Sequence, residues 1–276
     1  MKKIIVPVDF SVFSEYAAKT AALLAHKHDA DITLVHMLEL PQGYSDHDSD
    51  YGQSLVFMIK YAEKKMQEFV SKDFFTGVKI NVIIKHFRVF YELGEVAKDL
   101  DADLIIMGSH GTSEMEDYIV GSNTEKVVRS SNLPVLVIKD EINTVDFRNS
   151  VFVSDFKLES VNAYKKAQKL FRALNIKTKL LFVNRPDEGF VSTKEMHQRF
   201  EAFLMEADGD LKELGQFENY DDYSVEKGLY YYAERNNISL ISIATHGRTS
   251  ISKFFNKSIS LDIANKAHYP VLTFLI

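Results

Sequence analysis

The amino-acid sequence predicts two fused, doubly wound α/β domains, each with a five-stranded, mostly parallel sheet and helices on both faces. The first observation is that short apolar segments alternate with segments of helical periodicity, which is the pattern of parallel strands joined by crossover helices. The second is an internal repeat, in which the segment IIVPVDFS from Ile4 resembles VFVSDFKL from Val151. The segments DLIIMGSHG from Asp103 and SLISIATHG from Ser239 match in the same order.

Apolar runs place the strands of both repeats. The first repeat should have strands near residues 3–9, 31–37, 79–86, 103–108 and 134–139, and the second near residues 150–155, 178–184, 215–219, 238–244 and 271–275. Helices fill the intervals, and the clearest has a single apolar stripe from Ala163 to Leu174. The strand segments of the first repeat are apolar at consecutive positions, so we expect them to be buried on both faces.

The two repeats differ by an insertion. His110 and His246 are 136 residues apart, but Asp9 and Asp155 are 146 apart. The first repeat therefore carries about ten extra residues, and the polar stretch 41–54 is interpreted as an inserted loop.

A polar linker is predicted over residues 139–149, which gives domains at 1–142 and 148–276. The last strand of each repeat, PVLVI from Pro134 and PVLTF from Pro270, should lie at a sheet edge. Pairing of these two edges would hide both of them and produce an intramolecular pseudo-dimer, with further homo-oligomers left open.

Composition excludes several classes of protein. The chain has 33 Lys+Arg against 39 Asp+Glu, a net charge of −6, so no basic field would attract nucleic acid. It contains no cysteine, which excludes disulfides and thiolate metal sites and fits a reducing cytoplasm. No segment approaches the ~20 apolar residues of a membrane span. We expect a soluble, cytoplasmic protein that binds neither nucleic acid nor membrane.

The candidate ligand site follows the first and fourth strands, because parallel α/β sheets bind ligands at the carboxyl ends of strands where the strand order reverses. Asp9 ends the first strand. Gly108 and Gly111 follow the fourth, and Gly121-Ser122 opens a helix after nine further residues. Glycines admit a phosphate close to backbone N–H groups, and a helix N-terminus attracts the same anion. The Asp9 carboxylate suits ribose hydroxyls or an adenine amine, which are donors.

These segments, VPVDFS, DLIIMGSHG, GSNTEKVV and PVLVI, resemble the universal stress protein family, whose ATP-binding members carry Gly, two residues, Gly, nine residues, Gly-Ser/Thr. The resemblance covers essentially the whole chain and implies tandem Rossmann-like domains. It also implies an ATP site with Mg²⁺ or Mn²⁺ as counter-ion in the first domain. The residues that the resemblance places around adenine, ribose and phosphates are Val8, Asp9, Met37, Met107, Gly108, His110, Gly111, Gly121, Ser122 and Asn123.

The second repeat departs from this pattern. Ala244 and Lys257 occupy the positions of Gly108 and Gly121, so side chains should fill the cradle and the second domain should not bind ATP in the family's manner. Around the first site, Thr112 stands where the family is often basic, and acidic residues follow it at 114, 116 and 117, which favours modest affinity.

Simpler interpretations stay open for each candidate residue. The glycines could serve tight turns without any ligand. Asp9 and Asp155 could cap the helices that follow them. His110 and His246 could bond only to backbone, and no catalytic residue is assigned.

The function expected is a cytoplasmic stress-response protein that binds ATP or another adenine nucleotide in its N-terminal domain and acts as a nucleotide-dependent regulatory switch. The alternative is a nucleotide-free interaction module that binds a protein or a small apolar ligand. A slow ATPase ranks last, because the sequence has no GxxxxGK[ST] loop, no nucleophile elbow and no HExxH helix.

Overall fold

Five parallel strands form the sheet of the first domain in a computed structural model that describes residues 1–38, 49–86, 92–109, 122–186, 189–245 and 269–276. The strand order is β3-β2-β1-β4-β5, so the direction of winding reverses between β1 and β4, as in a doubly wound, Rossmann-like fold. The strands are β1 (Lys3–Pro7), β2 (Asp31–Leu38), β3 (Ile80–His86), β4 (Leu104–Gly108) and β5 (Val135–Ile138).

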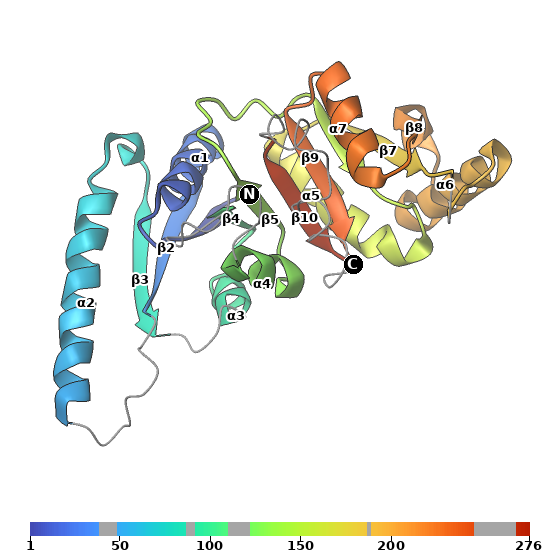
Figure 1. Cartoon of the computed structure of the whole chain (residues 1–276). Helices are drawn as coiled ribbons and strands as arrows, with labels where there is room; N and C mark the ends of the chain where they lie inside the picture. The colour runs from blue at the N-terminus through green and yellow to red at the C-terminus, as the bar shows by residue number, and fades with distance from the viewer. Residues whose placement is uncertain (39–48, 87–91, 110–121, 187–188, 246–268) are drawn as a thin grey trace.

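Helices cover both faces of this sheet (Figure 1). They are α1 (Val12–His28), α2 (Ser49–Val70), α3 (Glu92–Asp99) and α4 (Ser122–Ser130), with a short 3-10 turn η1 (Asp73–Phe75). The cores place α1 and α2 on one face and α3 and α4 on the other. The expected loop over 41–54 is wrong at its C-terminal end, because residues 49–54 form the start of α2.

The edge position of β3 overturns a second expectation. Asn81, Val82 and Lys85 are exposed, so this strand is not buried on both faces as its apolar sequence predicted. Only β2 pairs with β3, and the outer side of the strand lacks a neighbouring strand among the described residues. By contrast, β1, β4 and β5 lie inside the sheet and are buried almost throughout.

The second domain repeats the arrangement in the order β10-β9-β6-β7-β8. Its strands are β6 (Ser150–Val153), β7 (Thr178–Asn184), β8 (Phe217–Asp221), β9 (Leu240–Thr245) and β10 (Val271–Leu275). Its helices are α5 (Val161–Leu174), α6 (Thr193–Asp208) and α7 (Val225–Arg235), with 3-10 turns η2 (Leu158–Ser160) and η3 (Lys212–Gln216). The strand expected at 215–219 begins two residues later, because η3 occupies the residues before it.

Antiparallel pairing of β5 with β10 joins the two sheets into one of ten strands. Leu136 pairs with Leu272, its own counterpart in the repeat, so a pseudo-two-fold axis passes through this pair. Neither of these strands leaves an edge exposed to other chains. The expected pseudo-dimer through the two final strands is confirmed.

One apolar cluster runs across the join on the α1 and α5 face. It contains Leu136 and Ile138 from β5 together with Leu272 and Phe274 from β10, all at most 2% exposed. On the opposite face each domain has a separate cluster, beneath α3 and α4 in the first and beneath α7 in the second. The two domains therefore share one core as well as one sheet.

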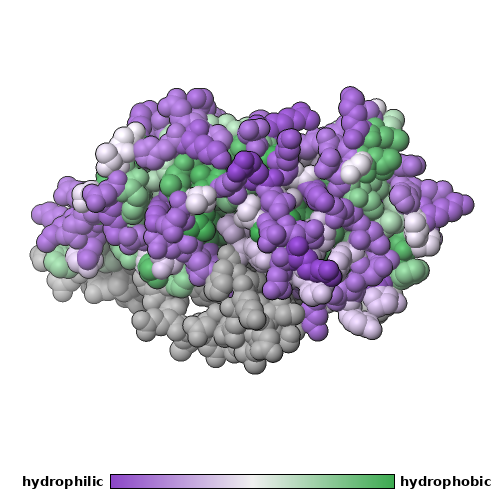
Figure 2. All heavy atoms as spheres, turned by 90° about the horizontal axis from the view of Figure 1, so that it is seen from above, coloured by the Kyte–Doolittle hydropathy of each residue, from purple (hydrophilic) through white to green (hydrophobic). Residues whose placement is uncertain are grey.

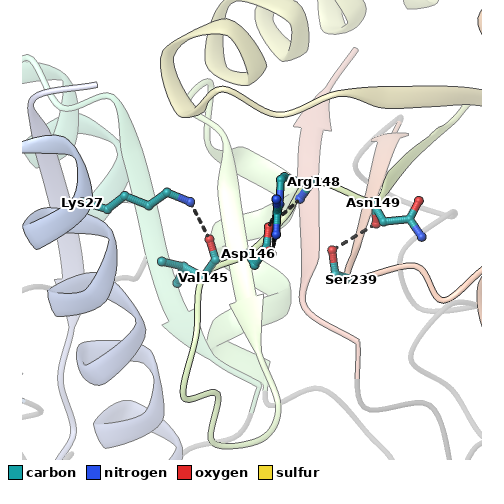
Figure 3. A network of polar contacts seen from close by, with 6 residues as sticks. All are labelled: Lys27, Val145, Asp146, Arg148, Asn149 and Ser239. Carbon is teal, nitrogen blue, oxygen red and sulfur yellow. Dashed lines mark hydrogen bonds and ion pairs between the residues drawn. The ribbon is translucent and has the colours of Figure 1, made fainter.

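The segment 139–149 between the domains packs against α1. Val145 and Phe147 are buried in the shared core although most of the segment is polar. Lys27 of α1 donates a hydrogen bond to the Val145 carbonyl at 3.0 Å, and Lys19 pairs with Glu141. These contacts attach the segment to the first domain, and Figure 3 shows the one between Lys27 and Val145.

The same segment is also attached to the second domain. The Ser239 N–H donates to the Asn149 carbonyl at 2.7 Å, and its hydroxyl donates to the same oxygen at 3.0 Å. Between these two attachments, the side-chain hydrogen bond from Arg148 lowers the pKa of Asp146 to about 2. The linker is therefore held at both ends.

The face seen in Figure 2 is mostly hydrophilic, with apolar atoms in scattered patches. None of the described helices combines the length and the apolar character that a membrane crossing requires.

Candidate functional site

The candidate site lies where β1 and β4 end side by side in the first domain, with β2 on the other side of β1. The chain leaves β1 into α1, and the N-terminal end of α4 is tied to the end of β4. The strand order reverses between β1 and β4, so the two connections diverge to opposite faces and leave space between them.

Val8 and His36 hold the turn that follows β1. The Val8 N–H donates to the Val35 carbonyl at 2.8 Å, which continues the pairing with β2 beyond the end of β1. His36 Nδ1 lies 2.7 Å from the Val8 carbonyl oxygen. A carbonyl can only accept, so this nitrogen carries the proton. Val8 itself is 3% exposed, and its side chain belongs to the core.

Asp9 supports the start of α1 with one of its two carboxylate oxygens. Its Oδ1 accepts from the Ser11 N–H at 3.0 Å and from the Ser11 hydroxyl at 2.6 Å. The Ser11 Oγ in turn accepts from the Ser14 N–H at 3.2 Å and is the N-cap. The helix cap is therefore Ser11 and not Asp9. Among the described residues Asp9 Oδ2 has no hydrogen-bond partner and remains an acceptor.

Phe10 lies between these residues in the left-handed region, with φ at +64°. Non-glycine residues seldom adopt this conformation, which costs on the order of 1 kcal/mol and persists where neighbours hold it. The Phe10 ring packs at 4.6 Å from the His36 ring and 6.0 Å from Phe69 of α2. Its counterpart Phe156 has φ at +50°, so both repeats use the same turn.

Gly108 is required by packing. A Cβ at this position would lie 2.7 Å from the carbonyl carbon and oxygen of Phe13 and 2.8 Å from its Cβ. The first turn of α1 thus crosses the end of β4 too closely for any side chain. Gly108 is therefore needed for the close packing of α1 on β4, which is a structural role other than that of a turn residue.

Thr124 fixes the start of α4 to the end of β4. Its hydroxyl donates to the Gly108 carbonyl at 2.8 Å, and the side chain is 3% exposed. Asn123, one residue earlier, is half-buried, and its Oδ1 accepts from Lys126 Nζ at 3.4 Å. Lys126 forms no ion pair with any described residue, so its charge is available at this end of the helix.

The two methionines lie on the α3 and α4 face. Met107 is 4% exposed and belongs to the core cluster there, so its side chain packs in the protein interior. Met37 is half-buried and packs against the same cluster. Of the two, only Met37 has surface left for a ligand.

The remaining predicted residues fall partly outside the described structure. His110, Gly111 and Gly121 lie outside the described residues. The backbone of Ser122 begins α4, but its side chain is not described. The structure thus brings together Val8, Asp9, Met37, Gly108 and the start of α4, and it leaves the glycine loop untested.

In the second domain the turn after β6 packs against several aromatic side chains. Phe156 is 1% exposed and packs against Phe200, Phe203 and Phe217 at ring distances of 5.0, 5.3 and 5.7 Å. These contacts leave the turn after β6 embedded in an aromatic cluster.

Polar groups around this turn also have partners. Asn184, at the end of β7, donates to the Val191 carbonyl at 3.2 Å and accepts from the Val191 N–H at 3.0 Å, which holds the following segment. Asp155 Oδ1 accepts from the Lys157 N–H at 3.2 Å and from the Ser160 hydroxyl at 3.1 Å. Ser160 precedes α5 without a side-chain cap, so Asp155 does not cap that helix directly.

Sequence reasoning missed three residues of the site, namely His36, Thr124 and Lys126. Two of them could have been noticed in the sequence. His36 is a histidine at the end of an apolar strand, and Thr124 is a threonine just inside a helix after Gly-Ser. Neither signal identifies the partner, because Val8 and Gly108 come from distant segments. Lys126 offers no sequence signal, since an exposed-face lysine on a helix is common.

Comparisons with known proteins identify related sequences and structures. The sequence model of the universal stress protein family matches residues 1–139. A putative universal stress protein of Staphylococcus saprophyticus is 32% identical over 167 residues, which cover 56% of this chain and 94% of that protein. A universal stress protein of Methanocaldococcus jannaschii is 29% identical over 153 residues and covers 50% of this chain.

The whole chain also resembles solved structures in fold. A universal stress protein from Archaeoglobus fulgidus aligns with 99% of this chain and 96% of its own at a TM-score of 0.66, with 20% identity. This similarity shows that the tandem arrangement of two such domains occurs elsewhere. The family model covers residues 1–139, half of the chain, and the chain therefore belongs to the universal stress protein family.

Proposed function

We propose that the first domain, residues 1–142, binds ATP and that the nucleotide acts as a regulatory switch, with the second domain, residues 148–276, as a partner that lacks this site. The observation that carries the proposal is the Thr124 hydrogen bond to Gly108, which keeps the N-terminus of α4 at the end of β4, beside the turn that contains Asp9. A nine-residue helix so placed offers free N–H groups to a phosphate.

The charged groups around the site suit a ligand that is anionic at one end and carries hydrogen-bond donors at the other. Lys126 sits near the start of α4, where its positive charge would favour an anion. Asp9 Oδ2 is an acceptor without a described partner, and it suits a ribose hydroxyl or an adenine amine. The two groups belong to opposite ends of a nucleotide.

Mg²⁺ or Mn²⁺ would enter with the phosphates. No cluster of three or more candidate metal ligands occurs among the residues that the structure describes. Such an ion usually keeps several waters and is bound largely through phosphate oxygens, so the protein need not supply a full set of ligands.

The function proposed is binding and regulation in the cytoplasm, and no residue is assigned a catalytic role. A nucleotide that spans the β1–α1 turn and the start of α4 would tie the two connections together. We expect the turn and α4 to become more protected from hydrogen exchange when ATP binds, which is the conformational signal that a partner could read.

The test is calorimetric titration of ATP with Mg²⁺ into the full chain after bound nucleotide has been removed. We expect one site per chain, lost in Gly121→Lys, which copies the second repeat. Asp9→Ala should weaken binding about tenfold or more, because a hydrogen bond to a charged group is worth roughly 1.5–3 kcal/mol. Asp155→Ala is the matched control and should leave the affinity unchanged.

Two results would overturn the proposal. No heat from the wild type, together with no nucleotide in the denatured extract, would leave a nucleotide-free interaction module as the better interpretation. Binding without any change in hydrogen exchange would remove the switch and leave only a binding site. Competition with AMP and cyclic AMP ranks the ligands, and accumulation of ADP in proportion to protein would reveal slow hydrolysis.

A further inference from the structure

The second domain contains a hollow of about 360 Å³ between α5, β7 and η3. Thr178 and Leu180 at the start of β7 form part of its wall. The candidate nucleotide site lies at the carboxyl ends of the strands. This hollow lies instead at the amino end of β7. It is therefore separate from the position that corresponds to the nucleotide site.

The first domain shows that the fold does not require a hollow here. Thr178 pairs with Ser150 as Ile32 pairs with Ile4, so residues 146 apart correspond in this part of the repeat. The counterpart of Thr178 is thus Ile32, which is fully buried.

The difference lies in the turn that covers each site. In the first domain, η1 contributes Phe75, 4% exposed, and Phe74 packs against the same core. In the second domain, η3 has the sequence KELGQ and contributes no buried residue. The first domain is closed by aromatic rings at this place, and the second is left open.

Thr178 also carries a buried polar atom behind this wall. Its hydroxyl oxygen is buried and has no hydrogen-bond partner among the described residues. An unsatisfied buried polar group costs about 1–3 kcal/mol. The position tolerates an isoleucine in the other repeat, so the hydroxyl is not needed for packing.

The remainder of the wall combines apolar side chains with a positive rim. Phe171, Ile176 and Leu180 provide the apolar part. Arg172 and Lys177 are exposed, and neither forms an ion pair with any residue in the described ranges. An arginine fork matches the geometry of a carboxylate.

One end of the hollow is neutral or acidic. Tyr164 accepts a hydrogen bond from Gln168 at 2.7 Å and donates to Asp208 at 3.5 Å. Burial raises the pKa of Tyr164, and the nearby charges of Asp208 and Glu213 raise it further, so the hydroxyl stays protonated. Glu213 is the one acidic side chain on the wall, against two basic ones. The acidic end and the basic rim give the ligand an orientation.

We propose that this hollow is a second ligand site, which takes a small carboxylate with an apolar body. The carboxylate would pair with Arg172 and Lys177, and the apolar body would lie against Phe171, Ile176 and Leu180. The volume is at the lower end of the range of about 300–1,000 Å³ for small-molecule sites. The proposal does not depend on ATP binding in the first domain.

The probe for this site is phenylacetate, with 2-phenylethanol and phenethylamine as neutral and cationic analogues of the same shape. Backbone amide shifts of the isotope-labelled full chain are followed by NMR during titration. We expect saturable shifts in α5, η3 and the start of β7, with phenylacetate bound about tenfold or more tightly than phenethylamine.

Variants distinguish specific binding in the hollow from nonspecific binding to the surface. Arg172→Ala should weaken phenylacetate binding about tenfold, whereas Lys169→Ala, which removes an exposed charge from the same helix outside the hollow, should leave it unchanged. Thr178→Ile copies the first repeat and adds bulk to the wall, so it should weaken phenylacetate binding. Thermal melts confirm the fold of each variant.

The proposal is overturned if phenylacetate causes no saturable shift at tens of millimolar, if the three probes bind alike, or if Arg172→Ala and Lys169→Ala behave alike. The titration is repeated in Gly121→Lys, where unchanged phenylacetate binding is expected whether or not ATP binds. If one of the two ligands binds and the other does not, the result shows which proposal fails, the nucleotide site or the carboxylate site.

Discussion

Replacing Gly108 by alanine tests whether this glycine is present for packing or for a phosphate. The added Cβ would lie 2.7 Å from two backbone atoms of Phe13, whereas ordinary contacts begin near 3.4 Å. The first turn of α1 and the end of β4 must therefore separate by roughly 0.7 Å if the alanine is to fit, given these two distances. Both partners are parts of regular elements, so neither can move as a flexible side chain would.

The expected cost follows from the size of the clash. Overpacking of this kind costs about 1–3 kcal/mol, and the loss of glycine's freedom in the unfolded chain returns about 0.4–1 kcal/mol. We expect a net loss of about 1–2 kcal/mol in the free energy of unfolding, which corresponds to a fall in Tm of roughly 2–8 °C.

Denaturant and thermal unfolding of the nucleotide-free protein measure this effect. Ala244→Gly is the matched control in the second repeat, where no clash is relieved, and it should cost about 0.5–1 kcal/mol through backbone entropy alone. If Gly108→Ala unfolds like the wild type without nucleotide but loses ATP binding, the packing argument is refuted and the glycine serves the ligand only.

Three further predictions concern single hydrogen bonds. Ser11→Ala removes the cap of α1 and should cost about 1 kcal/mol in urea denaturation, and an unchanged midpoint would show that the cap is redundant. Thr124→Val leaves the Gly108 carbonyl without its side-chain donor and should cost about 1–2 kcal/mol and weaken ATP binding in calorimetry, whereas unchanged affinity would separate α4 from the site. Burial raises the pKa of Glu218. The hydrogen bonds that its carboxylate accepts from Lys179 and Tyr232 lower this pKa by more, so the net shift is downward. A lowered pKa stabilises the fold above the unfolded value and loses that contribution as the pH falls through the folded value. Tyr232→Phe should therefore destabilise the protein more at pH 7 than at pH 3, and equal costs at both values would contradict the assignment.

The positions of the strands along the chain, the doubly wound class and the pairing of the domains could be predicted from the sequence. Apolar runs located all ten strands to within a few residues, because burial on both faces leaves a continuous signal in one dimension. The pairing of the two final strands was predicted from their edge positions and from the resemblance to the family, whereas the register of Leu136 on Leu272 is seen only in the structure. The polar insertion was predicted as a loop over residues 41–54, but residues 49–54 form the start of α2. The apolar side of this helix is only partly visible in the sequence.

The tertiary structure alone decided how the site residues act. Gly108 is a glycine because of Phe13, the left-handed Phe10 packs against His36, and the start of α4 is fixed by Thr124. Each of these contacts joins segments that are separate in the chain, and their distances depend on how the helices settle on the sheet.

The hollow in the second domain belongs to the same category. The repeat shows that Thr178 stands where the first half has Ile32, but not that η3 fails to cover it. Periodicity and repetition are properties of the sequence itself, so they determine the architecture and the family. Close approach, open volume and unpaired atoms arise only when distant segments pack together, so they are decided by the folded protein.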